Sequence, residues 1–371
     1  MLKPIRVLHV VGKMHRAGLE TFIMNLYRNI DRTKIQFDFL THYEEEGDYD
    51  QEIYALGGKI HRFSVMEDKN LISYLKELNV FFKKHKEYKI VHGHWATLGM
   101  FYFFAAKRNG VRYRIAHAHN DRMPPGMRGE FINFLIKPIK YLANNYFACS
   151  QPAIKWLYGK KSKVVRKNQV KIVNNAIDSE KFIYNKNIRE DYRKKFDLEK
   201  NFIIGHIGRF DFQKNHKFII KIFKDIIEKD DQAILFLIGS GPDMDVIKNQ
   251  VKNLGLEKSV YFLGNRADIP ELLSTIDLFL LPSNYEALGI VAIEAQAAGL
   301  PTVVSDAVPE EAYATELVKP LSLNADEKEW LKVVLKNKHI DRSNMMDEIK
   351  KSGYDINDLS DFFENFYLEM I

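Results

Sequence analysis

Two cationic side chains follow a short apolar run in the second half of the chain. The run FIIGHI at residues 202–207 predicts a buried strand, and the segment GRFDFQK follows it directly. Arg209 and Lys214 therefore leave the strand end in a loop, where a guanidinium and an ammonium group can together hold a diphosphate. Pairing of Arg209 with a neighbouring carboxylate explains the same pattern equally well, so this segment alone does not identify a site.

A glycine-rich segment, GSGPDMD at residues 239–245, follows another apolar run, AILFLI. Its glycines permit close backbone approach to a ligand, but the segment is not a complete dinucleotide fingerprint. Asp243 and Asp245 have the spacing of a metal-binding pair, although the first turn of a helix accounts better for two carboxylates. A similar pair, Asp48 and Asp50, lies in an acidic loop and is expected to be solvated.

The longest motif is NYEALGIVAIEAQAAGLPTVVSD at residues 284–306. A helix is expected to open near Gly289, and its free N–H groups and positive dipole end favour an anion. Glu294 can accept paired hydrogen bonds from a ribose diol, and Glu286 can reach a sugar hydroxyl. A glycosidase pair is disfavoured, because eight helical residues span about 12 Å whereas such carboxyl groups lie about 5–9.5 Å apart. Two surface glutamates on an amphipathic helix are the simpler alternative.

Two His-x-His pairs lie on predicted strands, His92 with His94 in VHGH and His117 with His119 in RIAHAH. Because side chains alternate along a strand, the members of each pair point to the same face. Such pairs can bind a metal ion, but no third ligand has convincing spacing, so no metal site is predicted. His117 is expected to be a core histidine.

These residues need elements that position them, and both halves alternate short β-branched or aromatic runs with longer amphipathic segments. Strands are predicted at residues 5–11, 37–40, 59–63, 89–94, 112–119, 146–150 and 170–175, and again at 202–208, 233–239, 260–264, 278–283 and 301–306. Helices are predicted at residues 20–29, 71–84, 129–144, 217–228, 243–254 and 289–298. This alternation is typical of α/β domains with parallel sheets, which bind ligands at the carboxyl ends of their strands.

The composition excludes several classes of protein. The chain has 371 residues, 46% hydrophobic and 28% charged, which is the balance of a folded globular protein with about two domains. The longest apolar stretch, residues 98–106, is far short of the about 18 residues that span a bilayer. The N-terminal run lacks a small-residue cleavage site, and the single cysteine excludes an intrachain disulfide. We therefore expect a cytoplasmic protein.

The net charge of +6 conceals two halves of opposite sign. Residues 1–181 carry 31 basic and 17 acidic side chains, a net charge of +14, and the remainder has a net charge of −8. Residues 101–171 alone hold 15 basic and two acidic side chains. Such a field favours an anionic partner, and nucleic acid, a membrane surface and a phosphorylated substrate all fit it.

Taken together, GR with Lys214, then GSGP, then FLG at residues 262–264 and E-A-L-G-x4-E-A-x-A-x-G-x-P resemble the retaining glycosyltransferases of family 4. The resemblance is strongest to the branch that builds bacterial exopolysaccharide and capsule. It implies the GT-B fold, in which two Rossmann-like, doubly wound α/β domains face each other across a cleft. Residues 1–181 would form the acceptor-binding domain, residues 182–353 the donor-binding domain, and the C-terminal helix in 354–371 would cross back to the first domain.

The resemblance also implies roles for individual residues. Arg209 and Lys214 would bind the donor diphosphate, Glu286 the donor sugar and Glu294 the ribose, with His119 lining the reaction centre; His119, Arg209, Lys214 and Glu286 form the catalytic set. Further donor contacts would come from the loops at Gly18, Gly239, Gly264, Asn265, Arg266, Leu288, Gly289 and Ile290. On the acceptor side, His15, Arg16 and His94 are candidates.

The implied reaction uses a nucleoside-diphosphate sugar, most often UDP-linked, with no metal ion or other cofactor. The sugar would pass with retention of configuration to a polyprenyl-diphosphate-linked saccharide. A nucleotide-sugar 2-epimerase of the same architecture, or a non-enzymatic module that binds membranes or nucleic acid, are the alternatives. The epimerase would need acid/base carboxylates and would lack the two spaced glutamates, and the module leaves Arg209 and Glu294 unexplained.

A membrane surface is predicted in the basic half. Residues 126–145 combine large apolar side chains with cations, as in helices that lie in a membrane interface, although the apolar face of any such helix can instead pack on its own sheet. The cations proposed to meet lipid are Arg128, Lys137, Lys140, Lys160, Lys161 and Lys163. We expect peripheral attachment to the anionic inner face of the cell membrane, and no binding of nucleic acid, since no nucleic-acid module accompanies the charge.

Overall fold

The computed structural model describes residues 3–63, 70–120, 126–338 and 340–371. The chain forms an N-terminal domain, made of Met1–Ala176 together with Ile356–Ile371, and a C-terminal domain, Ile177–Asp355. The sequence predicted that the first segment of the N-terminal domain ends at residue 181, five residues after the observed end, and that the C-terminal segment begins at residue 354, two residues before the observed start. The boundaries shift because Ile177 pairs with Asp355 through a parallel bridge and packs in the core of the C-terminal domain.

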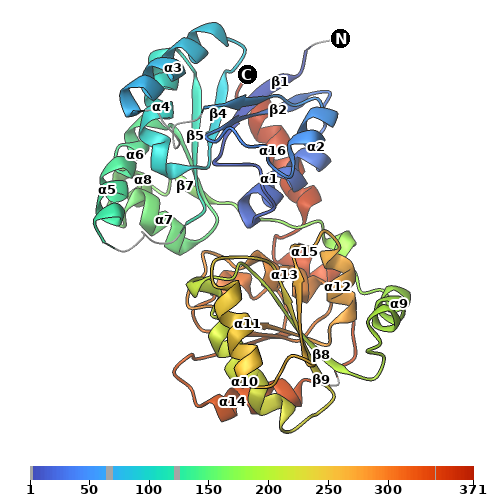
Figure 1. Ribbon diagram of the computed structural model, residues 1–371. Helices are drawn as coiled ribbons and strands as arrows, with labels where there is room; N and C mark the ends of the chain where they lie inside the picture. Colours follow the sequence, from blue (N-terminus) through green and yellow to red (C-terminus); the bar gives the residue numbers. More distant parts are fainter. Residues whose placement is uncertain (1–2, 64–69, 121–125, 339) are drawn as a thin grey trace. The chain divides into compact units, whose positions relative to one another are not determined.

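A parallel sheet forms the centre of the N-terminal domain, with strand order β3-β2-β1-β4-β5-β6-β7 (Figure 1). Its strands are β1 (Ile5–Val10), β2 (Ile35–Thr41), β3 (Ile60–Arg62), β4 (Ile90–Gly93), β5 (Tyr113–Ala118), β6 (Asn145–Ala148) and β7 (Val170–Ile172). Each lies within or beside a run predicted from the sequence. Successive strands are added outward from β1 on one side and from β4 on the other, so the strand order reverses between β1 and β4.

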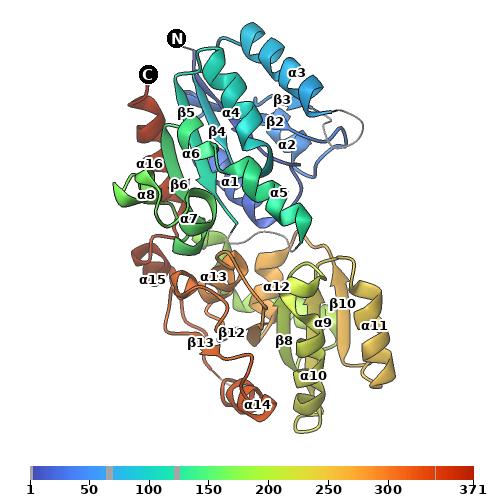
Figure 2. The ribbon, with the colours of Figure 1, turned by 90° about the vertical axis from the view of Figure 1, so that its left-hand side faces the viewer.

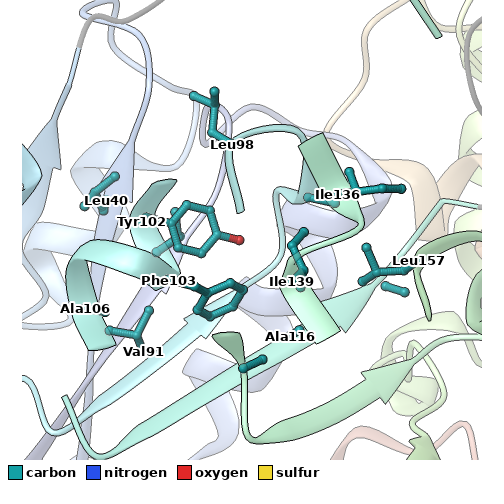
Figure 3. Close-up of a cluster of buried hydrophobic side chains, with 14 of the residues drawn as sticks. Leu40, Val91, Leu98, Tyr102, Phe103, Ala106, Ala116, Ile136, Ile139 and Leu157 are labelled. Atoms are coloured by element: carbon teal, nitrogen blue, oxygen red, sulfur yellow. The ribbon is translucent and has the colours of Figure 1, made fainter. Parts of the chain in front are cut away.

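Helices cover both faces of this sheet, as the alternation of buried residues requires. The helices are α1 (Gly18–Asn29), α2 (Asp50–Ala55), α3 (Leu71–Lys84), α4 (Gly99–Arg108), α5 (Met127–Ile136), α6 (Ile139–Leu142), α7 (Gln151–Tyr158), α8 (Lys163–Arg166) and α16 (Ile356–Leu368). Side chains of α3 to α8 pack against one face of the sheet, in the core drawn in Figure 3. Side chains of α1, α2 and α16 pack against the other face.

One predicted helix is divided. The pattern at residues 129–144 predicts a single helix, whereas the structure has α5 and α6 with a turn between them. Pro138 explains the break, because proline has no N–H to donate and its ring clashes with the preceding turn of a helix. The two short segments still bury Ile132, Ile136 and Ile139 in the core of the domain.

Helix α16 returns to the N-terminal domain after the whole of the C-terminal domain. It lies beside α1 and β2, and in Figures 1 and 2 its red ribbon runs among elements coloured blue and green. Phe363 and Tyr367 are fully buried there, with Phe363 ring centroids 5.7 Å from those of Phe147 and His92. The predicted return of the C-terminal helix is therefore confirmed.

The C-terminal domain repeats the architecture with strand order β10-β9-β8-β11-β12-β13, again parallel throughout. Its strands are β8 (Phe202–Ile207), β9 (Ala233–Ile238), β10 (Val260–Gly264), β11 (Leu278–Leu281), β12 (Thr302–Ser305) and β13 (Val318–Leu321). Its helices are α9 (Lys186–Phe196), α10 (His216–Ile227), α11 (Met244–Asn253), α12 (Ile269–Thr275), α13 (Ile290–Ala297), α14 (Glu327–Lys336) and α15 (Met346–Lys351). Side chains of α10, α11 and α14 pack on one face, and those of α12, α13 and α15 on the other.

Both domains are therefore Rossmann-like, doubly wound α/β domains. Each has one place where strand order reverses, between β1 and β4 in the first domain and between β8 and β11 in the second. In open parallel sheets, ligands bind beyond the carboxyl ends of the strands at this reversal. Among the described residues, no helix combines the length and apolar character needed to cross a bilayer.

We predict that Phe363→Ala destabilises the N-terminal domain by about 3–5 kcal/mol, because it removes a fully buried ring and leaves a cavity between α16 and the sheet. Urea denaturation of the full chain measures this change. Leu368→Ala, on the same helix but 38% exposed, is the matched control and is expected to cost no more than about 0.5 kcal/mol. Equal, small effects of both substitutions would contradict the packing described for α16.

Candidate active site

Two loops meet where the strand order of the C-terminal domain reverses. Arg209 and Lys214 follow β8, and Glu286 follows its neighbour β11. The loops are joined directly, because the Asn284 N–H donates to the Gln213 carbonyl at 2.8 Å and the Asn284 side-chain amide donates to the Phe212 carbonyl at 2.6 Å. The structure thus brings together cations and a carboxylate that are more than 70 residues apart in sequence.

The strongest contact between these loops is a buried ion pair. The Lys214 Nζ atom lies 2.5 Å from Glu286 Oε1, and the Glu286 side chain is only 6% exposed. The same carboxylate accepts hydrogen bonds from Ser283 Oγ at 2.7 Å and from Gln213 Nε2 at 3.0 Å. A buried carboxylate needs such partners to offset its desolvation, and here they also fix its orientation.

Arg209 is placed differently from Lys214. Its side chain is 71% exposed, and the only ion pair it forms among the described residues is a long one, 3.9 Å from Nε to Asp211 Oδ2. Asp211 is itself engaged, since its carboxylate accepts from the Lys214 backbone N–H at 3.3 Å at the start of a 3₁₀ turn. The alternative of a structural pairing for Arg209 is therefore weak, and its guanidinium remains open to a ligand.

The glycine-rich segment packs directly on the Arg209 loop. Gly239 has φ +130°, and a Cβ atom there would lie 2.2 Å from the Gly208 carbonyl oxygen, so the close approach requires glycine. The Gly239 N–H donates to the Gly264 carbonyl at 2.8 Å, which adds the end of β10 to the same edge. Beyond β10, Asn265 is exposed. Arg266 donates from Nε to Asp268 Oδ1 at 2.8 Å and from Nη2 to Asp268 Oδ2 at 2.5 Å.

Helix α13 begins beside these loops. Gly289 is its N-cap with φ +86°, so glycine is again favoured, and Ile290 is the first helical residue. Leu288 is buried, so only its backbone is available to a ligand. Glu286 lies four residues before the helix, so the about 12 Å estimated for a continuous helix does not apply to the two glutamates. The predicted separation is wrong for this pair, so helical spacing does not exclude a glycosidase pair.

Glu294, on α13, is a partly buried carboxyl group for which the described residues provide no hydrogen-bond partner. Burial raises the pKa of Glu294 from 4.5 to about 7. Removing a carboxylate from water without compensation is unfavourable, so the residue is poorly explained by stability of the domain alone. A ligand hydroxyl pair that donates to it would supply the missing partners.

The candidates in the N-terminal domain follow β1. Gly18 is the first residue of α1, with Ala17 as an extended N-cap. The His15 Nδ1 atom lies 3.4 Å from Asp48 Oδ2, and the Arg16 backbone N–H donates to the same oxygen at 3.0 Å. The expectation that both carboxylates of this acidic loop are solvated is wrong for the second, because Asp50 is buried and paired with a cation of β3.

Histidines gather at the reversal of strand order in the N-terminal domain. The structure adds His9, on β1, to the four histidines that the sequence singled out, and we call these five residues the histidine cluster: His9, His92, His94, His117 and His119. Ring nitrogens of His94 lie 3.0 Å from His9 and 2.9 Å from His119. His92 lies 3.2 Å from His117 and 2.7 Å from the Tyr367 hydroxyl.

Burial lowers the pKa of every member of the histidine cluster. The values for His9 and His119 fall from 6.5 to about 3, and those of His92, His94 and His117 fall well below their usual range. Desolvation is the largest cause in each case, and neighbouring imidazoles add to it for the three most strongly affected. All five rings are therefore neutral at pH 7, and His117 is buried as expected of a core histidine.

The predicted membrane segment presents two faces. Ile132, Leu135, Ile136 and Ile139 are buried, whereas Met127, Phe131, Phe134 and Tyr141 are 55–91% exposed. Lys137, Lys160, Lys161 and Lys163 are exposed, and Lys140 is partly so. Arg128 lies in α5, but its side chain is outside the described part of the structure. Packing on the sheet thus accounts for only one face of α5 and α6.

Sequence reasoning did not find several members of these sites. Ser283 and Gln213 hold the Glu286 carboxylate, and both stand beside motifs that were recognised. Glu20, on the first turn of α1, is largely withdrawn from water, and this burial raises its pKa to about 7. Glu20 lies in the sequence GLE, Gln213 in FQK and Ser283 in PSNYE, all beside recognised motifs. The sequence does not show whether a polar side chain beside a motif points inward.

Comparisons with known proteins agree with this geometry. The family described as "Glycosyl transferases group 1" matches residues 188–322. The chain is 34% identical to the putative glycosyltransferase EpsF of Bacillus subtilis (strain 168) over 334 residues, which cover 89% of this chain and 86% of that protein. The chain belongs to this glycosyltransferase family.

Two further similarities are informative. The glycosyltransferase is 30% identical, over 66% of its length and 63% of the other chain, to the Escherichia coli UDP-Gal:alpha-D-GlcNAc-diphosphoundecaprenol alpha-1,3-galactosyltransferase. The crystal structure of Anabaena Alr3699/HepE in complex with UDP and glucose superposes with a TM-score of 0.81 at 18% identity, covering 98% of this chain and 100% of that one. Structural neighbours of this kind are GT-B glycosyltransferases, and the two Rossmann-like domains agree with that class.

We predict that Glu294→Gln stabilises the C-terminal domain at high pH. Burial raises the pKa of the Glu294 carboxyl from 4.5 to about 7. The free energy of unfolding of the domain therefore falls as the pH rises from about 4.5 to about 7, and it does not fall further above pH 7. The variant should therefore exceed the wild type by about 2–3 kcal/mol at pH 8 and match it near pH 4. Urea denaturation at the two pH values measures this difference.

Glu316→Gln, at an exposed site of the same domain, is the matched control and should show no such dependence on pH. A pH-independent difference between the wild type and Glu294→Gln would contradict the desolvation described for Glu294.

Proposed function

We propose that this glycosyltransferase is a retaining family 4 enzyme that transfers a sugar from a UDP-linked donor to a polyprenyl-diphosphate-linked saccharide during cell-surface polysaccharide synthesis. The observation that carries the proposal is the arrangement at the reversal of strand order in the C-terminal domain. An open guanidinium, a buried Lys214–Glu286 pair, a helix N-terminus and an unpartnered Glu294 carboxyl lie on loops and a helix at one sheet edge.

Each group matches one part of a nucleoside-diphosphate sugar. Arg209 and the free N–H groups at the start of α13 complement the diphosphate. The fixed Glu286 carboxylate accepts from sugar hydroxyls, and Lys214 retains donors beyond the one it gives to Glu286. Glu294 accepts from the two ribose hydroxyls, which supply the partners it lacks. The Anabaena structure named above holds UDP and glucose, and the Escherichia coli relative is named for a UDP-galactose donor.

The chemical difficulty is the negative charge that develops on the leaving diphosphate as the glycosidic bond breaks. Arg209, Lys214 and the α13 N-terminus stabilise that charge, and the positions of Lys214 and the α13 N-terminus are fixed before the substrate arrives. This device needs no metal ion at the donor site. With retention by front-face attack, the acceptor hydroxyl forms the new bond to the anomeric carbon while its proton passes to the departing phosphate oxygen. No protein base is then required, and the neutral His119 ring lines the reaction centre.

The acceptor side uses the N-terminal domain and the membrane. A polyprenyl diphosphate stays in the bilayer, so the enzyme must come to the membrane surface. The exposed side chains of Phe131, Phe134 and Tyr141 beside Lys137 and Lys140 provide the apolar and cationic contacts that an interfacial segment uses. We infer peripheral attachment to the inner face of the cell membrane. The diphosphoundecaprenol in the name of the Escherichia coli relative supports this class of acceptor.

The donor site is tested with Arg209→Ala. Loss of a charge-assisted contact to phosphate costs about 1.5–3 kcal/mol, so UDP should bind about 10- to 100-fold more weakly than to the wild type. Isothermal titration calorimetry measures the affinity, and a screen of UDP- and GDP-sugars for donor hydrolysis identifies the sugar. Lys221→Ala, on α10 and paired with Glu327, is the matched control and should bind UDP like the wild type.

Two results would overturn this assignment. Unchanged UDP binding by Arg209→Ala removes the guanidinium from the donor site. A product in which the sugar is epimerised rather than transferred, detected by mass spectrometry and NMR, replaces the transferase with a nucleotide-sugar epimerase.

The membrane surface is tested with the double variant Phe131→Ser/Phe134→Ser. Its binding to vesicles that contain anionic phospholipid should fall by about tenfold, because two exposed rings no longer enter the interface. The double variant Ile72→Ser/Val80→Ser removes side chains of similar exposure from α3 and is the matched control. Co-sedimentation at low salt measures both. Equal binding of the two variants, or failure of the wild type to sediment, would contradict the proposed membrane surface.

A further inference from the structure

The histidine cluster lies between the first sheet and two helices. His9 on β1, His92 on β4 and His117 on β5 point to the face covered by α1 and α16, as strand alternation requires. Phe22 of α1 lies 6.0 Å from the His117 ring and 5.9 Å from the His119 ring, and Phe363 of α16 lies 5.7 Å from His92. The imidazoles are thus held by packing from both sides, which limits the rotamers they can adopt.

Several ring nitrogens of this cluster are buried and have no hydrogen-bond partner among the residues that the structure describes. They are His9 Nε2, His117 Nε2 and His119 Nδ1. A buried nitrogen that forms no hydrogen bond costs about 1–3 kcal/mol, and native structures contain few of them. Hydrogen bonding within the cluster therefore does not account for all of its nitrogens. An ion that accepts the lone pair of His117 Nε2 would supply a partner for one of them.

We propose that His94, His117 and His119 form a binding site for a divalent transition-metal ion of the zinc class. One ring nitrogen from each of these residues lies within 4.8 Å of those of the other two, and the three residues come from neighbouring strand ends of a rigid sheet. The site lies in the N-terminal domain, apart from Arg209, Lys214, Glu286 and Glu294 of the proposed donor site, and shares His119 with the proposed reaction centre.

The distance between two of the proposed ligand atoms is close to that of a tetrahedral site. Zinc binds imidazole nitrogen at about 2.0–2.1 Å, so two ligating nitrogens of a tetrahedral site lie about 3.3 Å apart. The His94 Nδ1 and His119 Nε2 atoms are 2.9 Å apart. Insertion of an ion between them therefore requires adjustments of a few tenths of an ångström, with small ring rotations. The contact between the two rings is then replaced by two bonds to the metal.

The remaining histidines are placed to orient the ligands. His117 uses Nδ1 to contact His92 at 3.2 Å, so its Nε2 lone pair is left for the ion when Nδ1 carries the proton. His92 then donates through its own Nδ1 to the Tyr367 hydroxyl at 2.7 Å. His94 likewise uses Nε2 to donate to His9 at 3.0 Å, which frees Nδ1. Hydrogen bonds to the second nitrogen of a ligating histidine are the usual outer support of a metal site.

The donor set also selects the metal. Neutral imidazoles suit Zn²⁺, Cu²⁺, Ni²⁺ and Co²⁺, whereas Mg²⁺ and Ca²⁺ require oxygen ligands. Three protein ligands leave a fourth position for water or for an oxygen of a bound molecule. His119 is partly exposed, so this position is reached from the solvent side of the cluster.

The test uses the full chain without a polyhistidine tag, freed of metal by chelation and then titrated with Zn²⁺ and, separately, Co²⁺. We expect about one equivalent of zinc per chain by elemental analysis after desalting. Bound Co²⁺ should give the intense visible absorption of tetrahedral coordination. His119→Asn should reduce zinc affinity by about tenfold or more, and His92→Asn, which removes an outer support, by about tenfold.

The matched control is His85→Asn, in a histidine pair with His61 away from the cluster, and should bind zinc like the wild type. Circular dichroism and thermal unfolding establish that each variant is folded. The conclusion rests on His119→Asn, because His119 is partly exposed and its replacement disturbs the core least. Absence of stoichiometric zinc in the folded wild type would overturn the proposal. So would equal zinc binding by wild type and His119→Asn, or loss of binding in His85→Asn alone. Because UDP binding is measured separately, failure here leaves the donor site unaffected.

Discussion

In a parallel sheet every strand ends at the same edge, and both sheets of this glycosyltransferase are parallel throughout the pairs described. The loops that leave neighbouring strands must then lie side by side, whatever their distance in sequence. At the reversal of strand order the two loops turn toward opposite faces, which leaves backbone and side chains between them available to a ligand. The position of Arg209, Lys214 and Glu286 in one domain, and of the histidine cluster in the other, follows from this constraint.

The buried pair of Lys214 and Glu286 shows how the edge is held together. An ion pair removed from water gains little net stability over apolar packing, but loss of either partner leaves the other charge without its counterion. The two loops are therefore tied to each other by a contact that tolerates little change. Arg209 forms only a long ion pair, and the Glu294 carboxyl has no hydrogen-bond partner among the described residues, so neither side chain ties the loops together. The site combines a fixed centre with flanking groups that keep their binding capacity for a ligand.

The sequence predicted the strands well because apolar runs with β-branched residues are unambiguous in a buried parallel sheet. It missed β13, where Val318–Leu321 contains a proline and two exposed residues and so lacks that signal. The positions of Arg209, Lys214 and Glu286 at strand ends were predicted correctly, because each follows a clear apolar run. The position of His9 was not, because alternation identifies the face of each strand but not which strands are neighbours. Only the order β1-β4-β5 brings His9 to His94.

Helix α16 has a consequence for how the protein is made. The N-terminal domain ends its continuous segment at Ala176, yet its core includes Phe363, Tyr367 and other side chains that follow the entire C-terminal domain in the sequence. At about 5–20 residues per second, translation of the intervening chain takes roughly 10–40 seconds. During that time the face of the first sheet that α16 covers is exposed on the ribosome. The domain that is synthesised first is thus the one completed last, and this apolar surface stays uncovered until α16 emerges.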